Sequence, residues 1–254
     1  YTYTWAGVLG YGSVDGPGGN TGTCKLSYPR SIACHAGCCY NGETLRIRRM
    51  KISSKFVDTT AGGGVATEGV GTGARFSSVR GLRFHPVHAI LYGIDQTYRR
   101  LFKMPLDTLQ VTTIAGATPT PSSGFQNGAT GESARFNDPS GVAFFGWIIV
   151  ADRNNNAIRT VEGSGNYVAT VIAGKGPTLP GWTDGPAGGA KFKSPVAVCG
   201  VPPGTILVVD AGNSVIRKIT NLFLSTQRMV STIAGVPLQF GVAATAPPPS
   251  STSP

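Results

Sequence analysis

Residues 171–219 read VIAGKGPTLPGWTDGPAGGAKFKSPVAVCGVPPGTILVVDAGNSVIRKI, and this stretch decides the fold. It opens on a strand-like phrase ending in Ala-Gly and passes through a Gly-rich loop to the basic and aromatic pair Lys191-Phe192. Two apolar runs follow, and the second closes on Asp210, seven residues before Arg217. Short apolar runs separated by Gly, Pro and Asn predict a meander of antiparallel strands.

The same pattern recurs along the chain. The Ala-Gly phrase ends at Gly7, Gly62, Gly116, Gly174 and Gly235, so its intervals are 55, 54, 58 and 61 residues. A unit of four short strands cannot bury both faces of its sheet alone, so the units must stack around an axis. The sequence therefore predicts an all-β fold, a β-propeller of four-stranded blades within residues 1–240. The predicted repeats span about 8–62, 63–116, 117–174 and 175–235.

The phrase at Tyr3–Gly7 adds one edge strand to four complete blades. A closed ring has no place for this strand, because the fourth blade already ends with its own phrase. We therefore expect four blades plus one extra strand, as part of a larger or open array.

Acidic and basic residues repeat in register with the strands. An Asp at the end of a strand accepts backbone N–H bonds in the turn, and an Arg seven residues later lies near it on the next strand. This predicts a scaffold of Asp95, Asp152, Arg159, Asp210 and Arg217, with Phe102-Lys103 as the second copy's counterpart of Ile158-Arg159 and Asn41 as the first copy's counterpart of the Asp. We expect Phe76, Phe136 and Phe192 to be wedges between blades.

The pattern of STIAG, Asp-Gly, ARF, PxGV, IxVAD and NxxIRKI resembles the NHL repeat, a β-propeller unit. The resemblance is most specific in Thr113–Val161 and Val171–Ile219. It implies a propeller, and some NHL propellers bind RNA through a basic face. Similar propeller enzymes, such as amidating lyases and strictosidine-synthase-like proteins, use metal-binding or acidic residues around a central channel. The in-register aspartates would be the candidates here, but residues that repeat in every blade indicate a scaffold.

The composition excludes several classes of protein. The hydrophobic fraction of 41% is too high for a disordered chain, and no apolar run approaches the roughly 18 residues of a membrane-spanning helix. The net charge of +10 suits a polyanionic partner. A candidate basic patch consists of Arg46, Arg49, Lys51, Arg99 and Arg100. An ordinary solvated surface is the favoured interpretation of this patch.

Four of the five cysteines lie in the first repeat. Adjacent residues on a strand point to opposite faces, so Cys38 and Cys39 are poorly placed for one metal ion. The favoured interpretation is disulfide bonding among Cys24, Cys34, Cys38 and Cys39, with the pairing left open. We expect Cys199 to be a small buried residue of a strand.

Residues 241–254 form a Pro/Ser/Thr-rich tail or linker, which includes AATAPPPSSTSP. It resembles the hydroxyproline-rich, extensin-like stretches of plant and green-algal surface glycoproteins, and Thr118–Ser123 is a shorter version. Candidate hydroxylation or O-glycosylation positions are Pro119, Pro121, Pro247, Pro248, Pro249, Ser250, Ser251 and Ser253. An unmodified linker is the alternative.

The sequence offers no assembled catalytic site. Pro86 interrupts any helix that would align His85 with His88, so we expect a polar turn there. We predict a non-enzymatic, extracellular or cell-surface, structural or adhesive module of an O-glycosylated surface or filament assembly, without a metal or cofactor. Its predicted partners are other protein subunits or other parts of a longer chain, and glycans. One alternative is an intracellular NHL module binding RNA or protein through its basic face, although nucleic acid is the less favoured partner. The other is a lyase or hydrolase with a channel metal.

Overall fold

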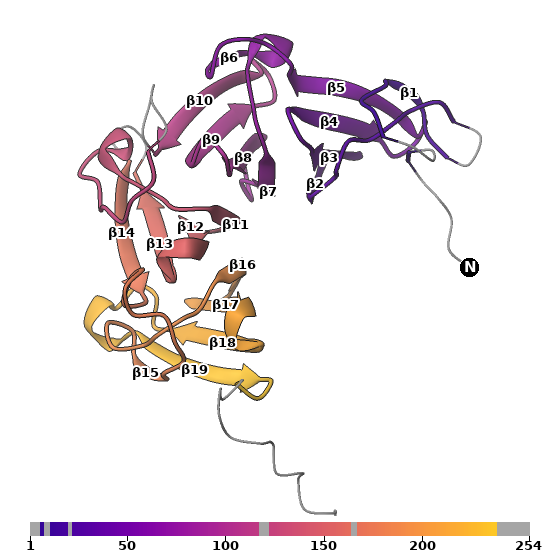
Figure 1. Cartoon of the computed structure of the whole chain (residues 1–254). Coiled ribbons are helices and arrows are strands. Elements are labelled where there is room, and N and C mark those ends of the chain that lie inside the picture. The colour runs from indigo at the N-terminus through magenta and orange to yellow at the C-terminus, as the bar shows by residue number, and fades with distance from the viewer. Residues whose placement is uncertain (1–5, 8–10, 20–21, 117–121, 164–166, 238–254) are drawn as a thin grey trace, which may run out of the picture.

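The structure is a computed structural model and describes residues 6–7, 11–19, 22–116, 122–163 and 167–237. Within these residues the chain forms four antiparallel sheets that follow one another along the sequence (Figure 1). We name them blades one to four. The predicted edge strand at 3–7 and the Pro/Ser/Thr-rich tail lie largely outside the described residues.

The blades have the following strands. Blade one contains β1 (Gly16–Pro17), β2 (Ser31–His35), β3 (Cys38–Gly42), β4 (Arg46–Lys51) and β5 (Phe56–Gly62). Blade two contains β6 (Gly69–Val70), β7 (Val79–Phe84), β8 (Ile90–Asp95), β9 (Arg100–Pro105) and β10 (Gln110–Ala115). Blade three contains β11 (Pro139–Phe145), β12 (Trp147–Asp152), β13 (Ala157–Glu162) and β14 (Val168–Ala173). Blade four contains β15 (Gly185–Pro186), β16 (Pro195–Val201), β17 (Thr205–Asp210), β18 (Val215–Thr220) and β19 (Met229–Ala234).

Five single-turn 3₁₀ helices complete the described elements: η1 (Gly71–Gly73), η2 (Gly131–Ser133), η3 (Arg153–Asn155), η4 (Ala211–Asn213) and η5 (Ser225–Gln227).

Three blades have a fifth strand that the repeat pattern did not predict. β1, β6 and β15 are two residues long and pair with β5, β10 and β19 on the outer edge of their sheets. In blade three the same place holds a single bridge between Gly128 and Ala169. The Gly-rich loops are therefore attached to the outer edges of the sheets by these pairings.

Apolar cores fill the spaces between neighbouring blades. Phe76 lies in the core between blades one and two, Phe136 in the next, and Phe192 between blades three and four. These three rings are at most 1% exposed, so the predicted wedges are confirmed. The strands of a sheet that is covered on both faces need no alternation of apolar and polar residues, which explains apolar runs such as that of β12.

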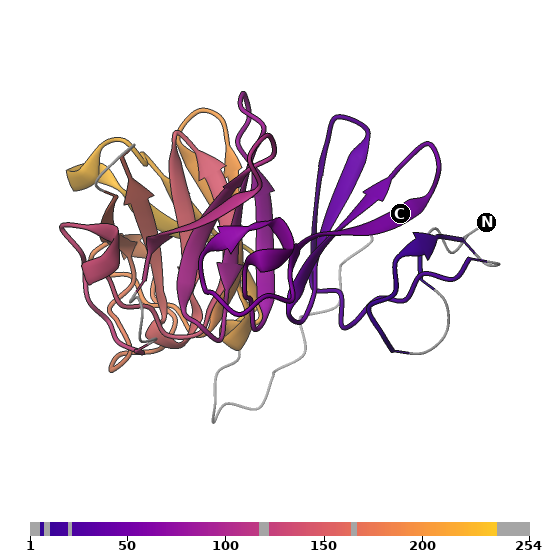
Figure 2. The same cartoon turned by 90° about the horizontal axis from the view of Figure 1, so that it is seen from above.

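The four sheets form an arc. The inner strands β2, β7, β11 and β16 contact one another in that order, and Figure 1 shows them around a common centre, with a gap between blade four and blade one. Figure 2 shows the sheets side by side, as a row of upright strands. Small antiparallel sheets arranged radially with apolar cores between them make a β-propeller, and in the described residues its ring is open.

Candidate functional site

Each blade buries one arginine beneath its connecting loop. Arg48, Arg100, Arg159 and Arg217 are at most 1% exposed. The guanidinium of Arg217 donates to the carbonyl oxygens of Lys191 at 2.9 Å and Thr183 at 2.8 Å, and it lies 2.7 Å from Asp184 Oδ1. One side chain thus ties the loop to the sheet.

A buried carboxylate accompanies this arginine. Asp152 accepts hydrogen bonds from the backbone N of Asn137 at 2.8 Å, from Asn155 Nδ2 at 2.7 Å and from Arg159 at 3.1 Å. The same three kinds of contact recur around Asp210. Burial raises the pKa of Asp152 to about 6, because loss of water outweighs the hydrogen bonds that favour the charged form. These carboxylates are fully buried and are enclosed in ion pairs.

The predicted basic patch is wrong at Arg100, because this side chain is buried. Its guanidinium donates to the carbonyl oxygens of Thr67 and Arg75 and lies 3.7 Å from Asp95. A guanidinium enclosed by backbone carbonyls and a carboxylate cannot meet an external polyanion.

The arginine of blade two also stands at another strand position than the sequence predicted. The register places Phe102, and not Lys103, level with Arg159. Arg100 lies two residues before Phe102 and therefore on the same face of the strand. Lys103 is on the opposite face, with its Nζ 3.4 Å from the hydroxyl of Tyr167.

The rest of the predicted patch is not one free cationic surface. Arg49 forms two hydrogen bonds with Asp58, at 3.0 Å and 2.7 Å. Arg46 and Arg99 are half-buried, and Lys51 is exposed.

In blade one, Glu43 supplies the buried carboxylate that an aspartate supplies in the other blades. Its side chain is fully buried, lies 3.6 Å from Arg48 and accepts hydrogen bonds from Ser27 N and from Asn41 Nδ2. Burial raises its pKa. Sequence reasoning placed the polar partner at Asn41 and missed this glutamate, although an acid two residues farther on was the available signal.

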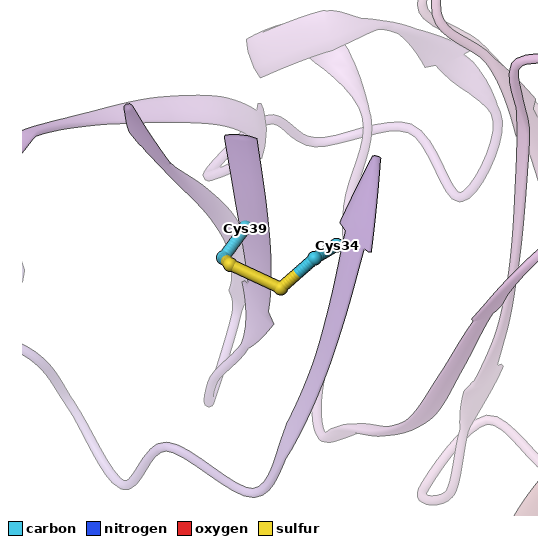
Figure 3. The surroundings of a disulfide bond; sticks show 2 residues. All are labelled: Cys34 and Cys39. Carbon is cyan, nitrogen blue, oxygen red and sulfur yellow. A yellow bond between two sulfur atoms is a disulfide. The ribbon is translucent and has the colours of Figure 1, made fainter. Parts of the chain in front are cut away.

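The cysteines of blade one follow the disulfide prediction in part. Cys34 of β2 and Cys39 of β3 are directly paired in register and form a disulfide (Figure 3). Cys24 is a buried free thiol, and Cys38 is a half-buried one. The expectation of a buried Cys199 is wrong, because this residue is exposed on β16. β16 belongs to the last described blade, and within the described residues no further sheet covers that face.

The first uncovered surface is on blade one, and we call it the blade-one end face: Leu26, Ile32, Cys39, Met50 and Val57. The same register position on the inner strand is held by Ile32, Leu82 and Val142. Leu82 and Val142 are 6% and 8% exposed beneath the preceding blade, whereas Ile32 is 62% exposed. A cavity of about 350 Å³ lies in this face.

The repeat pattern explains which residues line this cavity. Cys39 and Val57 are buried at its base, and Leu26 stands at the position that Phe76, Phe136 and Phe192 hold in the other blades. A leucine fills less space than a phenylalanine. The face is therefore a blade-packing surface that no other blade of the described residues covers, with a leucine in place of the large wedge.

The second uncovered surface is at the other end of the arc, and we call it the blade-four end face: Leu207, Val209, Ile216 and Ile233. Blade three holds Ala151 and Ile172 level with Val209 and Ile233. Those two residues are 0% and 4% exposed, whereas Val209 and Ile233 are 38% and 48% exposed. Both ends of the arc thus present apolar sheet faces that interior blades bury.

In the described part of the chain, no three His, Cys, Asp or Glu side chains lie close enough together to hold a metal ion. His85 Nδ1 accepts hydrogen bonds from the backbone N of Val87 and His88, which makes this segment a turn. Within the same residues, no helix has the length and apolar character that crossing a bilayer requires. All the candidate glycosylation positions lie outside the described residues.

Solved structures with a similar fold are found, whereas no family model matches the chain. A search of curated proteins gives no match either. An auxiliary nutrient binding protein from Bacteroides ovatus is 14% identical with a TM-score of 0.51, and the match covers 92% of this chain and 65% of that chain. Its counterpart from Bacteroides thetaiotaomicron is 14% identical with a TM-score of 0.50 and the same coverage.

A chain of a nidogen/laminin complex is 15% identical with a TM-score of 0.50, and the match covers 77% of this chain and 61% of that one. The chain thus spans less than two thirds of the length of these solved chains. At such identities the comparison shows the fold alone, and that fold is the β-propeller.

Proposed function

We propose that this protein is a non-enzymatic, extracellular structural module that acts by protein–protein contact through the blade-one and blade-four end faces. One observation carries the proposal: Ile32 is 62% exposed at a position where Leu82 and Val142 are buried by a neighbouring blade. Apolar patches of this kind mark interaction surfaces. The partner is a β-sheet face of another subunit or of another part of a longer chain, within an O-glycosylated surface or filament assembly.

Other features support this proposal. The aspartates that repeat in blades two, three and four are taken up in buried ion pairs, which suits a scaffold better than a catalytic channel. The Cys34–Cys39 disulfide suits an oxidising compartment. Structurally similar proteins include an auxiliary nutrient binding protein and a chain of a nidogen/laminin complex, and both names describe binding rather than catalysis.

The contact is tested with Ile32→Asp, compared with Val65→Asp as a matched control. Val65 is an exposed apolar residue, 90% accessible, in the loop between β5 and β6, outside both end faces. We expect wild type and Val65→Asp to enter the native assembly, and Ile32→Asp to remain a single unassembled chain in native mass spectrometry. Both variants should keep the wild-type melting temperature, because neither site is buried. An Ile32→Asp chain that assembles like wild type would contradict the proposal.

The extracellular assignment has its own test, the intact mass before and after reduction and chemical deglycosylation. We expect pentose or hexose mass on the segments around Pro119–Pro121 and Pro247–Ser253. We also expect a gain of two hydrogens on reduction of Cys34–Cys39. A bare mass with five free thiols would instead favour the intracellular module, whose binding to RNA would weaken steeply with salt.

A further inference from the structure

A second cavity of about 350 Å³ lies between blade two and blade three. Its size is within the range of about 300–1,000 Å³ that is usual for small-molecule sites. The strand register shows which side chains of blade two face it. Tyr92 of β8 belongs to the core between the two blades, and Lys103 of β9 is level with it and therefore lies on the same face. Lys103 reaches blade three, because its Nζ lies 3.4 Å from the hydroxyl of Tyr167.

The wall from blade three is apolar. Ile148 of β12 and Val161 of β13 are level with each other, and both belong to the core between blades two and three. The residues beside them point the other way. Trp147 packs in the core between blades three and four, and Glu162 Oε1 accepts a hydrogen bond from Thr160 on that same face. Among the described residues, the side chains that face the cavity thus include a lysine and no carboxylate.

Aromatic rings from both blades line the cavity. His85 packs against Phe144 with ring centroids 4.4 Å apart, and Tyr92 stacks on Phe144 at 5.9 Å. Lys103 Nζ lies 5.6 Å from the centre of the Tyr167 ring. Aromatic side chains pack best against another aromatic ring, either offset-stacked or edge to face. The lining therefore suits a ligand with a flat aromatic ring.

The charge of Lys103 is not neutralised as the matching charge of blade one is. In blade one, Arg49 is level with Asp58 of the next strand and pairs with it at 2.7 Å. In blade two, Lys103 is level with Thr112 at the corresponding place, so a hydroxyl replaces the carboxylate. A lysine that faces a cavity without this neighbouring carboxylate favours an anionic ligand.

The histidine of the lining adds a donor and no charge. His85 Nδ1 accepts hydrogen bonds from the backbone N of Val87 and His88, so the neutral ring carries its hydrogen on Nε2. Burial lowers the pKa of His85, and the ring is therefore neutral at pH 7. One ammonium group balances one carboxylate, whereas a phosphate dianion would bring a second negative charge that this lining does not balance.

We propose that this cavity binds a monocarboxylate whose carboxyl group is attached to a single aromatic ring. Lys103 and the hydroxyl of Tyr167 bind the carboxylate, and the rings of Tyr92 and Phe144 pack against the ring of the ligand. The combination is specific to the space between blades two and three, because the same place between blades one and two holds the Arg49–Asp58 pair.

Calorimetry on the purified chain tests this proposal with benzoate, benzamide and phenyl phosphate as probes at pH 7. We expect millimolar or tighter binding of benzoate. Benzamide has the same ring and no charge, so it should bind at least about tenfold more weakly. Phenyl phosphate should also bind more weakly than benzoate.

Two variants locate the binding. Lys103→Gln should weaken benzoate at least about tenfold and leave benzamide unchanged. Tyr167→Phe keeps the ring, removes the hydroxyl and should weaken benzoate several-fold. Lys51→Gln is the matched control, because it removes the same charge from an exposed lysine at the end of β4, outside the cavity lining. It should bind benzoate as wild type does. Unchanged melting of each variant guards against loss of fold.

Four results would overturn the proposal: no binding of benzoate, equal binding of benzoate and benzamide, tighter binding of phenyl phosphate than of benzoate, or wild-type affinity for benzoate in both Lys103→Gln and Tyr167→Phe. The end faces are not involved, so a failure here leaves the contact proposal standing, and the reverse also holds.

Discussion

The glycine that ends each Ala-Gly phrase is required by backbone geometry. Gly62, Gly116, Gly174 and Gly235 have φ between 87° and 107°. A Cβ on Gly174 would lie 2.5 Å from the carbonyl oxygen of Asn156, and Gly116 and Gly235 have the same approach. The phrase is therefore a structural signature, because a side chain at its last residue would meet the backbone of the neighbouring strand.

Gly174→Ala should lower the free energy of unfolding by about 2–3 kcal/mol, from left-handed strain together with the clash. Gly188→Ala is the control, because a Cβ there meets nothing within 4 Å. Urea unfolding of both variants measures the difference. Equal stability of the two variants would mean that the close approach is not needed.

The buried Asp152–Arg159 pair gives stability a defined pH dependence. The pKa of Asp152 is raised from 3.8 to about 6, so between these values the folded state holds a proton that the unfolded state has lost. The contribution of this group is therefore full below about pH 4 and is lost as pH rises through about 6.

Asp152→Asn cannot bind this proton. We expect the stability of wild type relative to Asp152→Asn to be greater at pH 4.5 than at pH 7, by about 2 kcal/mol. Unfolding curves of both chains at the two pH values provide the measurement. A relative stability that is constant, or greater at pH 7, would show that Asp152 is not desolvated in this way.

At the scale of the strand and the sheet, the sequence predicted most of the architecture. The Ala-Gly spacing and the runs ending at Asp95, Asp152 and Asp210 correspond to strands in the structure. These features recur in the sequence because the blades pack against one another in the same way.

The features that the sequence did not predict depend on the strand position and strand face from which a side chain reaches the buried ion pair. Arg100 takes the role expected of Lys103, three residues later, and Glu43 takes the role expected of Asn41. Each side chain brings its charge to the buried ion pair of its blade from a backbone position other than the expected one. The spacing along the sequence does not reveal this shift, because only the register of the folded strands shows that Phe102 occupies the position of Arg159. The cavity between blades two and three was missed for a similar reason, because its walls come from two blades.

The disulfide between β2 and β3 should stabilise blade one in particular. The two cysteines are five residues apart, and a loop of this length predicts about 2 kcal/mol. The double variant Cys34→Ser/Cys39→Ser should lose about that much in thermal or urea unfolding, and Cys199→Ser, at an exposed position, should lose almost nothing. A double variant as stable as wild type would show that the bond adds nothing to the blade.

At the scale of the whole molecule, the two ends of the arc are complementary by repetition. The blade-one end face corresponds to surfaces that the preceding blade covers, and the blade-four end face to surfaces that the following blade covers. The match covers 61–65% of the length of the similar solved chains. Under the proposed function, sheets of other subunits or of other parts of a longer chain are expected to complete the open arc of the described residues.

Electron cryomicroscopy of the assembly isolated from its source tests this expectation most directly. We predict a β-sheet packed on the blade-one end face, with its side chains in contact with Ile32 and Met50 and filling the cavity there. A map in which Ile32 and Met50 face solvent, while the chain is incorporated through another surface, would contradict contact through the ends of the arc.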